Sequence, residues 1–406
     1  MKDQEITVSH AGGKIKLDVP LTASKSECNR ALIIQALSEN QTSLGNISEA
    51  RDCQTMIRLL DSDEVVLDVL DAGTTMRFLT AYCTATNRES ILTGTARMQE
   101  RPIKILVEAL KSLGADIIYQ KNEGFPPIHI KSFNQQKKDI SIPGNVSSQY
   151  ISALLMVAPK LPLGLTLHLE GQITSRPYIM MTLQLMSHFG ITYTWEDTVV
   201  NISPQVYKSN DYVIESDWSG ASYWYSIVAL AKDAEVKLLG LRENSLQGDK
   251  AIVDIMMQLG VESTFDHDGV LLTKIPHQSE FDYDFSQCPD LAQTIAVICA
   301  AKGINAKLRG LESLRIKETD RIAALQKELL KVNIQVKVEG DSTIEVVPSS
   351  LQINSPNFSS YEDHRMAMAL APLALLGNIK IDEPEVVNKS YPTFWQHLEK
   401  AGFEID

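Results

Sequence analysis

Charged and hydroxyl side chains stand at the start of many apolar segments of this chain. Lys25 and Ser26 precede RALIIQAL, Arg321 precedes IAALQKEL, and Arg365 precedes MAMALAPLALL. The first turn of a helix exposes backbone N–H groups and a partial positive charge, and both favour anions. Arginine can also hold a phosphate or carboxylate with two parallel hydrogen bonds. An acidic protein with this pattern is therefore expected to bind a small, highly anionic ligand.

Further polar clusters occupy comparable positions along the chain. They are Asp71 to Arg77, Arg97 to Pro102, Ser147 to Gln149, Ser175 to Pro177, Asp290 after Pro289, Lys317 to Arg321, and Asp363 to Arg365. Each cluster taken alone could simply cap its helix. Ser24 and Glu27, for example, form an S-x-x-E capping box at the start of the first such segment. Lys317 and Asp320 could likewise pair in a solvated turn. Together, so many helix starts favour ligand binding over capping.

Other common sites are not indicated by the sequence. There is neither a G-x-x-x-x-G-K-[ST] loop nor a G-x-G-x-x-G loop, so a nucleotide site is not expected. His364 has no second histidine at ligand spacing, and the five cysteines never form C-x-x-C. We therefore expect reduced thiols in a cytosolic protein and no metal site.

The elements that must position these clusters follow a repeat. An amphipathic helix, a break, and an alternating strand recur in VEALKSLGADIIY, LQLMSHFGITYTW, DIMMQLGVESTF, LQKELLKVNIQVKV and QHLEKAGFEID. The breaks stand at 114, 190, 260, about 332 and 402, so the period is about 70 residues. A sixth, compressed copy is expected at MIRLLDSDEVVLDVL. Six units divide naturally into two α/β domains of three.

Length and charge exclude several classes of protein. The chain has 406 residues, 44% of them hydrophobic, which predicts two or three domains with real cores. Its net charge of −13 argues against sequence-independent binding of nucleic acid. No apolar run approaches the roughly 20 residues of a membrane helix, and MKDQEITVSH carries no targeting pattern.

Taken in order, ten segments resemble the 5-enolpyruvylshikimate-3-phosphate synthases. They are SKSECNRAL, DAGTTMRF, RMQERP, SSQY, TSRPY, LQGD, PDLAQTIAV, KETDR, DHRMAMA and NKSYPTFW. The resemblance implies an α/β (α+β) fold of two similar domains, each with three βαβαββ units of the inside-out barrel type. It places the active site in the interdomain cleft. It also implies a discontinuous domain, 1–20 with 218–406, and a second domain, 21–217.

The family's reaction transfers the enolpyruvyl group of phosphoenolpyruvate to the 5-hydroxyl of shikimate 3-phosphate and releases phosphate. The resemblance implies that these two anions are the partners, that there is no cofactor and no metal, and that the protein is a cytoplasmic monomer. It does not imply contact with nucleic acid or membrane.

The resemblance also implies roles for individual residues. The residues matched to shikimate 3-phosphate are Ser26, Arg30, Ser147, Ser148, Gln149, Ser175, Asp290, Ser313 and Lys317. The residues matched to phosphoenolpyruvate are Lys25, Gly73, Thr74, Arg101, Gln149, Arg321, Arg365 and Lys389. Asp290 and Glu318 are the matched proton-transfer carboxylates, with Lys25 as acid toward the bridging oxygen.

The chain departs from the family pattern in three places. Asp71 and Ser313 stand where the family usually has Asn, and residues 51–70 are about twenty residues short, which shortens one repeat. A carboxylate at 71 would face an anion, so we expect weaker phosphoenolpyruvate binding, partly offset by Arg77 or Arg101.

Two alternatives remain open at this point. A UDP-N-acetylglucosamine enolpyruvyl transferase shares the fold, but it uses a loop cysteine, and GTARMQERP has none. A catalytically silent binding protein of the same fold is favoured only by Asp71 and the shortened repeat.

Overall fold

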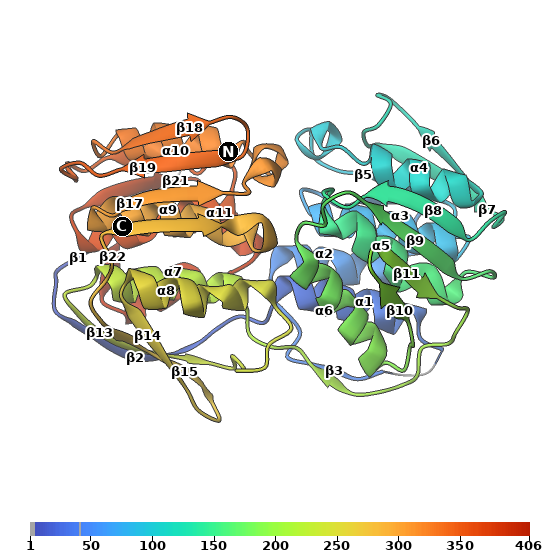
Figure 1. Cartoon of the computed structure of the whole chain (residues 1–406), viewed down its shortest axis with the longest axis horizontal. Helices are drawn as coiled ribbons and strands as arrows, with labels where there is room; N and C mark the ends of the chain where they lie inside the picture. The colour runs from blue at the N-terminus through green and yellow to red at the C-terminus, as the bar shows by residue number, and fades with distance from the viewer. Residues whose placement is uncertain (1–4, 40–41) are drawn as a thin grey trace. The chain divides into compact units, whose positions relative to one another are not determined.

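The computed structural model describes residues 5–39 and 42–406 and divides the chain into two units (Figure 1). Unit 1 contains the residues up to Ser24 together with Glu215–Asp406, and unit 2 contains Lys25–Ile214. The sequence places these boundaries at 20/21 and 217/218. Residues 1–4, assigned there to the first domain, lie outside the described residues.

Backbone pairing explains where the boundaries fall. Ala23 forms an antiparallel bridge with Ser216, and the Ser24 amide donates to the Glu215 carbonyl at 2.8 Å. The Asp217 amide donates to the Thr22 carbonyl at 2.9 Å. The two segments that connect the units, around Ala23 and Ser216, are therefore paired with each other.

Unit 1 consists of three repeats that follow one order, strand–helix–strand–helix–strand–strand. The first is β2 (Lys14–Pro20), α7 (Trp218–Leu230), β13 (Asp233–Leu239), α8 (Ile252–Leu259), β14 (Val261–Phe265) and β15 (Gly269–Lys274). The second is β16 (Glu280–Asp284), α9 (Ala292–Lys302), β17 (Asn305–Arg309), α10 (Arg321–Leu330), β18 (Gln335–Glu339) and β19 (Thr343–Val347). The third is β20 (Asn357–Phe358), α11 (His364–Leu370), β21 (Ile379–Asp382), α12 (Phe394–Lys400), β22 (Phe403–Ile405) and β1 (Glu5–His10).

Each repeat of unit 1 forms its own four-stranded sheet. The first two strands pair in parallel, as in β2 with β13, where Lys14 faces Asp233 and Pro20 faces Leu239. The remaining strands add in antiparallel order, as β15 does between β13 and β14. A parallel pair needs a crossover connection, and the first helix of each repeat supplies it.

Unit 2 contains two repeats of the same kind and a shorter third. The complete repeats are β4 (Val66–Asp68), α3 (Gly73–Ala85), β5 (Ser90–Thr93), α4 (Lys104–Leu113), β6 (Ala115–Tyr119), β7 (Ile128–Phe133); and β8 (Asp139–Pro143), α5 (Ser148–Val157), β9 (Leu165–Glu170), α6 (Arg176–His188), β10 (Thr194–Glu196), β11 (Val199–Ile202). The third is β12 (Tyr212–Val213), α1 (Lys25–Leu37), β3 (Leu44–Gly45) and α2 (Arg51–Leu60).

The short repeat coincides with the compressed stretch that the sequence singles out. Within the described residues β12 and β3 form a two-stranded parallel sheet, and after α2 the chain enters β4 of the next repeat. Only residues 61–65 lie between them, too few for two further strands. The helix and short strand predicted for this stretch are confirmed as α2 and β4.

The first crossover helices form the centre of each unit. In unit 1, α7, α9 and α11 contact one another, and nearly all of their residues are buried. In unit 2, α1, α3 and α5 do the same. The strands alternate between buried and exposed residues, as in β8, so each sheet covers the helices on one face only. None of the helices in the described ranges is long and apolar enough to cross a membrane.

The breaks read from the repeat mark real helix ends. Gly114 after α4 and Gly260 after α8 adopt the left-handed conformation with φ of 118° and 106°. Glycine adopts this conformation without the steric penalty of a side chain, which is why it stands there. Strands β6 and β14 follow directly, as predicted.

Candidate active site

Several of the polar clusters lie at the amino ends of the central helices, and the others precede α4, α6 and α10. In unit 1 the Asp217 side chain caps α7 by accepting from the Ser219 amide at 3.1 Å, and Asp363 caps α11 by accepting from the Arg365 amide at 2.9 Å. A short 3₁₀ turn, η5 (Pro289–Leu291), carries Asp290 into α9. The capping reading is thus correct for several clusters, and the same residues also hold other charged side chains.

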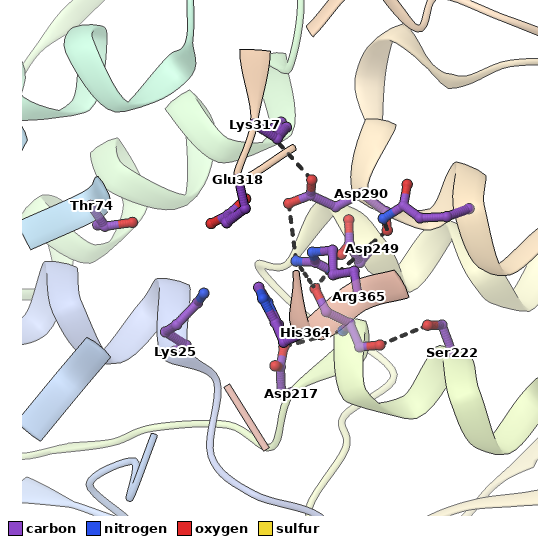
Figure 2. A network of polar contacts seen from close by, with 12 residues as sticks. Lys25, Thr74, Asp217, Ser222, Asp249, Asp290, Lys317, Glu318, His364 and Arg365 are labelled. Atoms are coloured by element: carbon purple, nitrogen blue, oxygen red, sulfur yellow. Dashed lines mark hydrogen bonds and ion pairs between the residues drawn. The ribbon is translucent and has the colours of Figure 1, made fainter. Parts of the chain in front are cut away.

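The Asp290 carboxylate is surrounded by three cations. Its Oδ1 lies 3.3 Å from Lys317 Nζ and 3.1 Å from Arg321 Nη1, and its Oδ2 lies 3.0 Å from Arg365 Nη2. Figure 2 shows Asp290 between Lys317 and Arg365. These residues come from two of the three repeats of unit 1, and Lys317 directly follows the 3₁₀ turn η6 (Glu312–Ile316). The tertiary fold therefore gathers charges that are scattered in the sequence.

These cations decide the protonation state of Asp290. Burial alone would raise the pKa of its carboxyl, but the three positive charges, Arg365 foremost, outweigh it and hold the pKa well below its ordinary value. Asp290 is therefore ionised at neutral pH.

Arg321 links three carboxylates from its buried position. Its Nε and Nη2 donate to Asp363 at 2.7 and 3.3 Å, and Nη2 also donates to Glu318 Oε2 at 3.0 Å. Burial lowers the pKa of Arg321, but the three carboxylates around it raise the pKa above its ordinary value. Lys389, in η8 (Pro384–Lys389), lies with Nζ 3.9 Å from Glu318 Oε1. Glu318 thus stands between two cations.

In unit 2, Lys25 begins α1 and pairs with a buried carboxylate of α2. Its Nζ lies 3.2 Å from Asp52 Oδ2, and the Asp52 side chain is 2% exposed. An ion pair so little exposed to solvent is screened less than a surface pair. The lysine ammonium is therefore held close to the start of α1, next to Ser26.

Arg30 occupies an enclosed position one turn into α1. Nε donates to Thr182 at 2.7 Å, Nη1 to the Ser26 carbonyl at 2.8 Å, and Nη2 to Ser152 at 3.1 Å. The guanidinium also lies 5.4 Å from the centre of the Phe78 ring. Burial lowers the pKa of Arg30 to about 10, so it stays cationic at neutral pH. Ser26 itself is half-buried.

Gly73 and Thr74 open α3 and contact Arg101 and Gln149. An added Cβ at Gly73 would lie 2.7 Å from Arg101 Nη1, so the guanidinium packs directly on the glycine. Thr74 Oγ1 accepts from Gln149 Nε2 at 3.1 Å. A side chain at 73 would therefore displace the end of the Arg101 side chain. Helices α3 and α5 are joined at their amino ends.

The serines matched to shikimate 3-phosphate lie at helix starts. Ser147 caps α5 by accepting from the Gln149 amide at 3.4 Å, and Ser148 is the first residue of that helix. Ser175 precedes α6 in the left-handed conformation, with φ of 51°. Ser313 is half-buried in η6 of unit 1. Hydroxyls at such positions can bind an anion together with the helix N–H groups.

The structure brings Arg51, which the sequence analysis did not name, to Asp71. Arg51 Nη2 lies 2.8 Å from Asp71 Oδ2. Arg77 donates to the carbonyls of Gly73 and Pro102, at 3.1 and 2.9 Å. Arg51 begins α2 in the shortened repeat, so its approach to Asp71 could not be inferred from sequence spacing.

Sequence reasoning also missed two residues beside Arg365. Ser219 Oγ lies 3.3 Å from Arg365 Nη2 and donates to Asp249. The segment LQGD contains Asp249, but only the resemblance drew attention to it, without a role. Its position before a helix, like that of the other clusters, was the available signal.

One further cluster has the composition of a metal site. Within the described residues, Asp266, His267 and Asp268 are the only group of three or more His, Cys, Asp or Glu side chains whose ligand atoms lie close enough to share an ion. All three are exposed, and Lys237 Nζ already pairs with both aspartates at 2.8 and 3.4 Å. This cluster is better explained as a surface ion pair.

Comparison with known proteins agrees with this geometry. A family model described as EPSP synthase (3-phosphoshikimate 1-carboxyvinyltransferase) matches residues 59–398. The 3-phosphoshikimate 1-carboxyvinyltransferase of Bacteroides fragilis (strain YCH46) is 48% identical over 399 residues, 97% of each chain. That of Vibrio campbellii is 34% identical over 415 residues, covering 95% of this chain and 96% of the relative.

The fold is also that of solved structures. The structure of EPSP synthase from Acinetobacter baumannii matches with a TM-score of 0.79 and 20% identity, over 100% of both chains. The family model, the curated relatives and the fold confirm the resemblance read from the ten segments. The chain belongs to the EPSP synthase (3-phosphoshikimate 1-carboxyvinyltransferase) family.

Proposed function

We propose that this protein transfers the enolpyruvyl group of phosphoenolpyruvate to the 5-hydroxyl of shikimate 3-phosphate, releasing inorganic phosphate. The observation that carries the proposal is the cationic cluster of unit 1, in which Lys317, Arg321 and Arg365 converge on Asp290. A site of this composition, in a member of this family, suits two substrates that are both strongly anionic.

Charge balance explains why so many cations are needed. Each substrate carries one carboxylate and one phosphate, so the pair brings together about six negative charges near neutral pH. Such anions repel each other unless cations and oriented N–H groups compensate them. Both units supply such groups, and we propose that residues of both act in the reaction.

The proposed ligands of shikimate 3-phosphate are hydroxyls, one amide, one carboxylate and two cations. They are Ser26, Arg30, Ser147, Ser148, Gln149, Ser175, Asp290, Ser313 and Lys317. The hydroxyls and Lys317 suit the phosphate, and Arg30 suits the carboxylate. Arg30 is already held by Thr182 and Ser152, so its orientation is set before the substrate binds.

The proposed ligands of phosphoenolpyruvate are mainly cations. They are Lys25, Gly73, Thr74, Arg101, Gln149, Arg321, Arg365 and Lys389. Arg321 is held by three carboxylates, so in this proposal it acts as a fixed positive charge. Arg101 lies against Gly73, where a side chain would displace its guanidinium.

The reaction needs one proton moved onto carbon and one removed from oxygen. The 5-hydroxyl oxygen bonds to C2 of phosphoenolpyruvate while C3 gains a proton, giving a tetrahedral intermediate. C3 then loses a proton as the C2–O bond to phosphate breaks. Asp290 and Glu318 are the proposed proton-transfer groups, and Lys25 is the proposed acid toward the bridging oxygen.

The environment of Asp290 constrains its role. A carboxylate whose pKa is held so low accepts a hydrogen bond well but takes a proton poorly. Anionic substrates would draw Lys317 and Arg365 toward themselves and thereby raise the pKa of Asp290. We propose that Asp290 orients the 5-hydroxyl first and becomes an effective base only when both substrates are bound.

Phosphate release tests the proposal directly. Purified protein is given both substrates, each substrate alone, and UDP-N-acetylglucosamine in place of shikimate 3-phosphate. Release that requires shikimate 3-phosphate supports the proposal. Binding of that compound without release would instead identify a silent protein, and release with the UDP-sugar would identify the other enolpyruvyl transferase.

We further propose that the protein acts as a monomer in the cytoplasm. Family membership supports both proposals. The candidate residues of unit 1 and those of unit 2 all belong to one chain, so the proposed site needs no second copy. Sedimentation at micromolar protein concentration tests the oligomeric state: a species of about twice the 45.1 kDa chain mass would contradict it.

A further inference from the structure

The Arg365 guanidinium rests on a hydroxyl that is itself bound to a carboxylate. Arg365 Nη2 donates to Ser219 Oγ at 3.3 Å, and Ser219 Oγ donates to Asp249 Oδ2. A serine hydroxyl has a single hydrogen. Because that hydrogen is given to Asp249, an oxygen lone pair is left to face the arginine. The three groups form a directed relay from Arg365 through Ser219 to Asp249.

Burial makes this relay more than a surface contact. The Asp249 side chain is only 2% exposed and lies in the 3₁₀ turn η3 (Gly248–Ala251). Hydrogen bonds that involve an ionised group are shorter and stronger than neutral ones. The Asp249 carboxylate therefore fixes the rotamer of Ser219. It also acts on Arg365 through the Ser219 hydroxyl, so its effect does not require a direct ion pair.

The turn that carries Asp249 is fastened to the start of α7. Gln247, just before η3, accepts from the Trp218 amide at 3.0 Å and donates to the Ser216 carbonyl at 2.8 Å. The same Nε2 lies 3.3 Å from the buried Glu215 carboxylate. The hydrogen bonds of the Gln247 side chain thus hold the turn of Asp249 beside Ser219.

Ser219 and Asp290 together hold both terminal nitrogens of the Arg365 guanidinium. Arg365 Nη2 also donates to Asp290 Oδ2 at 3.0 Å, and Nη1 lies 3.4 Å from the Asp290 carbonyl oxygen. A planar guanidinium held at two places keeps its remaining N–H groups in a defined direction. Fixing a binding group before the ligand arrives lowers the entropic cost of binding.

We propose that Ser219 and Asp249 are positioning residues that orient Arg365 for phosphoenolpyruvate, an inference that rests on the function proposed above. The relay acts on one substrate and not on the other. Loss of the Ser219 hydroxyl should therefore raise the KM for phosphoenolpyruvate about tenfold, while the KM for shikimate 3-phosphate and kcat change less than about threefold.

The test compares Ser219→Ala with Ser222→Ala, Ser219→Thr and Asp249→Asn by steady-state phosphate release. Ser222 lies one turn further along α7, and its hydroxyl donates to the Ser219 carbonyl at 2.7 Å. It is therefore a matched control for losing a serine hydroxyl from this helix. Ser219→Thr keeps the hydroxyl and should keep the KM, whereas Asp249→Asn should raise it severalfold.

A double variant separates positioning from general damage. In an Arg365→Lys background, adding Ser219→Ala should raise the KM for phosphoenolpyruvate no further, because the guanidinium fork that the relay orients is gone. Independent effects of equal size in both backgrounds would overturn the inference. So would equal values for Ser219→Ala and Ser222→Ala. Wild-type protein without phosphate release would overturn the proposed function itself.

Discussion

Asp290 and Arg321 form an ion pair in which Oδ1 and Nη1 are 3.1 Å apart, although the residues lie at the starts of two successive helices of one repeat. Lys317 Nζ shares the same oxygen at 3.3 Å. One carboxylate thus compensates several cations that would otherwise repel each other. This relationship makes Asp290 a structural as well as a catalytic candidate.

Asp290→Asn should therefore lose both activity and stability. The substitution leaves three cations around a neutral amide, and removing one partner of a largely buried ion pair costs about 3 kcal/mol. Phosphate release should fall about 100-fold or more. Asp282→Asn is the control, because Asp282 pairs with Arg309 at 2.8 Å on the exposed face of the same repeat. An Asp290→Asn protein with unchanged unfolding free energy would contradict the structural role.

Glu318→Gln should separate binding from turnover. Glu318 lies between Arg321 and Lys389, and the amide keeps its shape while losing its ability to transfer a proton. We expect kcat to fall about 100-fold or more, with KM values within about fivefold of wild type. The exposed Glu312 provides a Glu→Gln control in the neighbouring turn. Equal loss of binding and turnover would assign Glu318 to the scaffold.

Gly73→Ala should weaken phosphoenolpyruvate binding without destabilising the protein. The new methyl group would stand 2.7 Å from Arg101 Nη1 and 2.9 Å from Nη2, so the guanidinium must move. Alanine in place of glycine at a helix start lowers the conformational entropy of the unfolded chain, which favours the folded state. The KM for phosphoenolpyruvate should rise about tenfold while the melting temperature is unchanged or higher. A lower melting temperature with unchanged KM would refute this.

Arg51 should determine how much the Asp71 carboxylate weakens the binding of phosphoenolpyruvate. The two side chains are 2.8 Å apart, so the negative charge of Asp71 is already compensated. Arg51→Ala should raise the KM for phosphoenolpyruvate severalfold, and adding Asp71→Asn should restore it. Asp71→Asn alone should then have an effect of less than about threefold. A large improvement from that single change would show that Arg51 does not offset the carboxylate.

Lys302 should make stability depend on pH in the alkaline range. Burial and then the nearby charge of Lys274 lower its pKa to about 8, and its Nζ donates to the Ala229 carbonyl at 3.2 Å. Below pH 8 the folded protein carries a charge that burial disfavours, and between pH 8 and 10.5 the unfolded chain binds more protons than the folded one. Raising the pH through this window therefore removes the destabilisation caused by the buried Lys302 charge, and the free energy of unfolding rises.

The Lys302→Met variant lacks this penalty at every pH. Its unfolding free energy relative to wild type should be most favourable below pH 8 and should decline by about 1 kcal/mol by pH 10.5, since the site is partly solvated. Urea titrations at pH 6.5 and 10 measure the difference. An advantage that grows with rising pH would contradict the assigned shift.

The sequence was sufficient to predict those features that depend only on residues adjacent in the chain. Capping groups such as Asp320, which accepts from the amides of Ile322 and Ala323, and left-handed glycines such as Gly114 follow from local backbone geometry. Since a helix start, a break and an alternating strand each involve only a few consecutive residues, their repetition every 70 residues or so predicted the modular fold.

Partner choice across the chain could not be read from the sequence. Arg51 approaches Asp71, Lys317 pairs with Asp290 rather than Asp320, and Asp249 accepts from Ser219. These pairs depend on which helix ends the parallel crossovers place together. They also depend on the loss of two strands from one repeat, and no local pattern encodes such distances.

By itself, then, the sequence determined the anionic character of the ligand and the helix starts that carry the basic residues, because both depend on local residue type. The tertiary structure alone decided which carboxylate each cation faces, because Coulomb energy falls with distance and only the folded chain sets those distances. That is why the segment DHRMAMA made Arg365 a candidate, while its hydrogen bond to Ser219 could not be predicted.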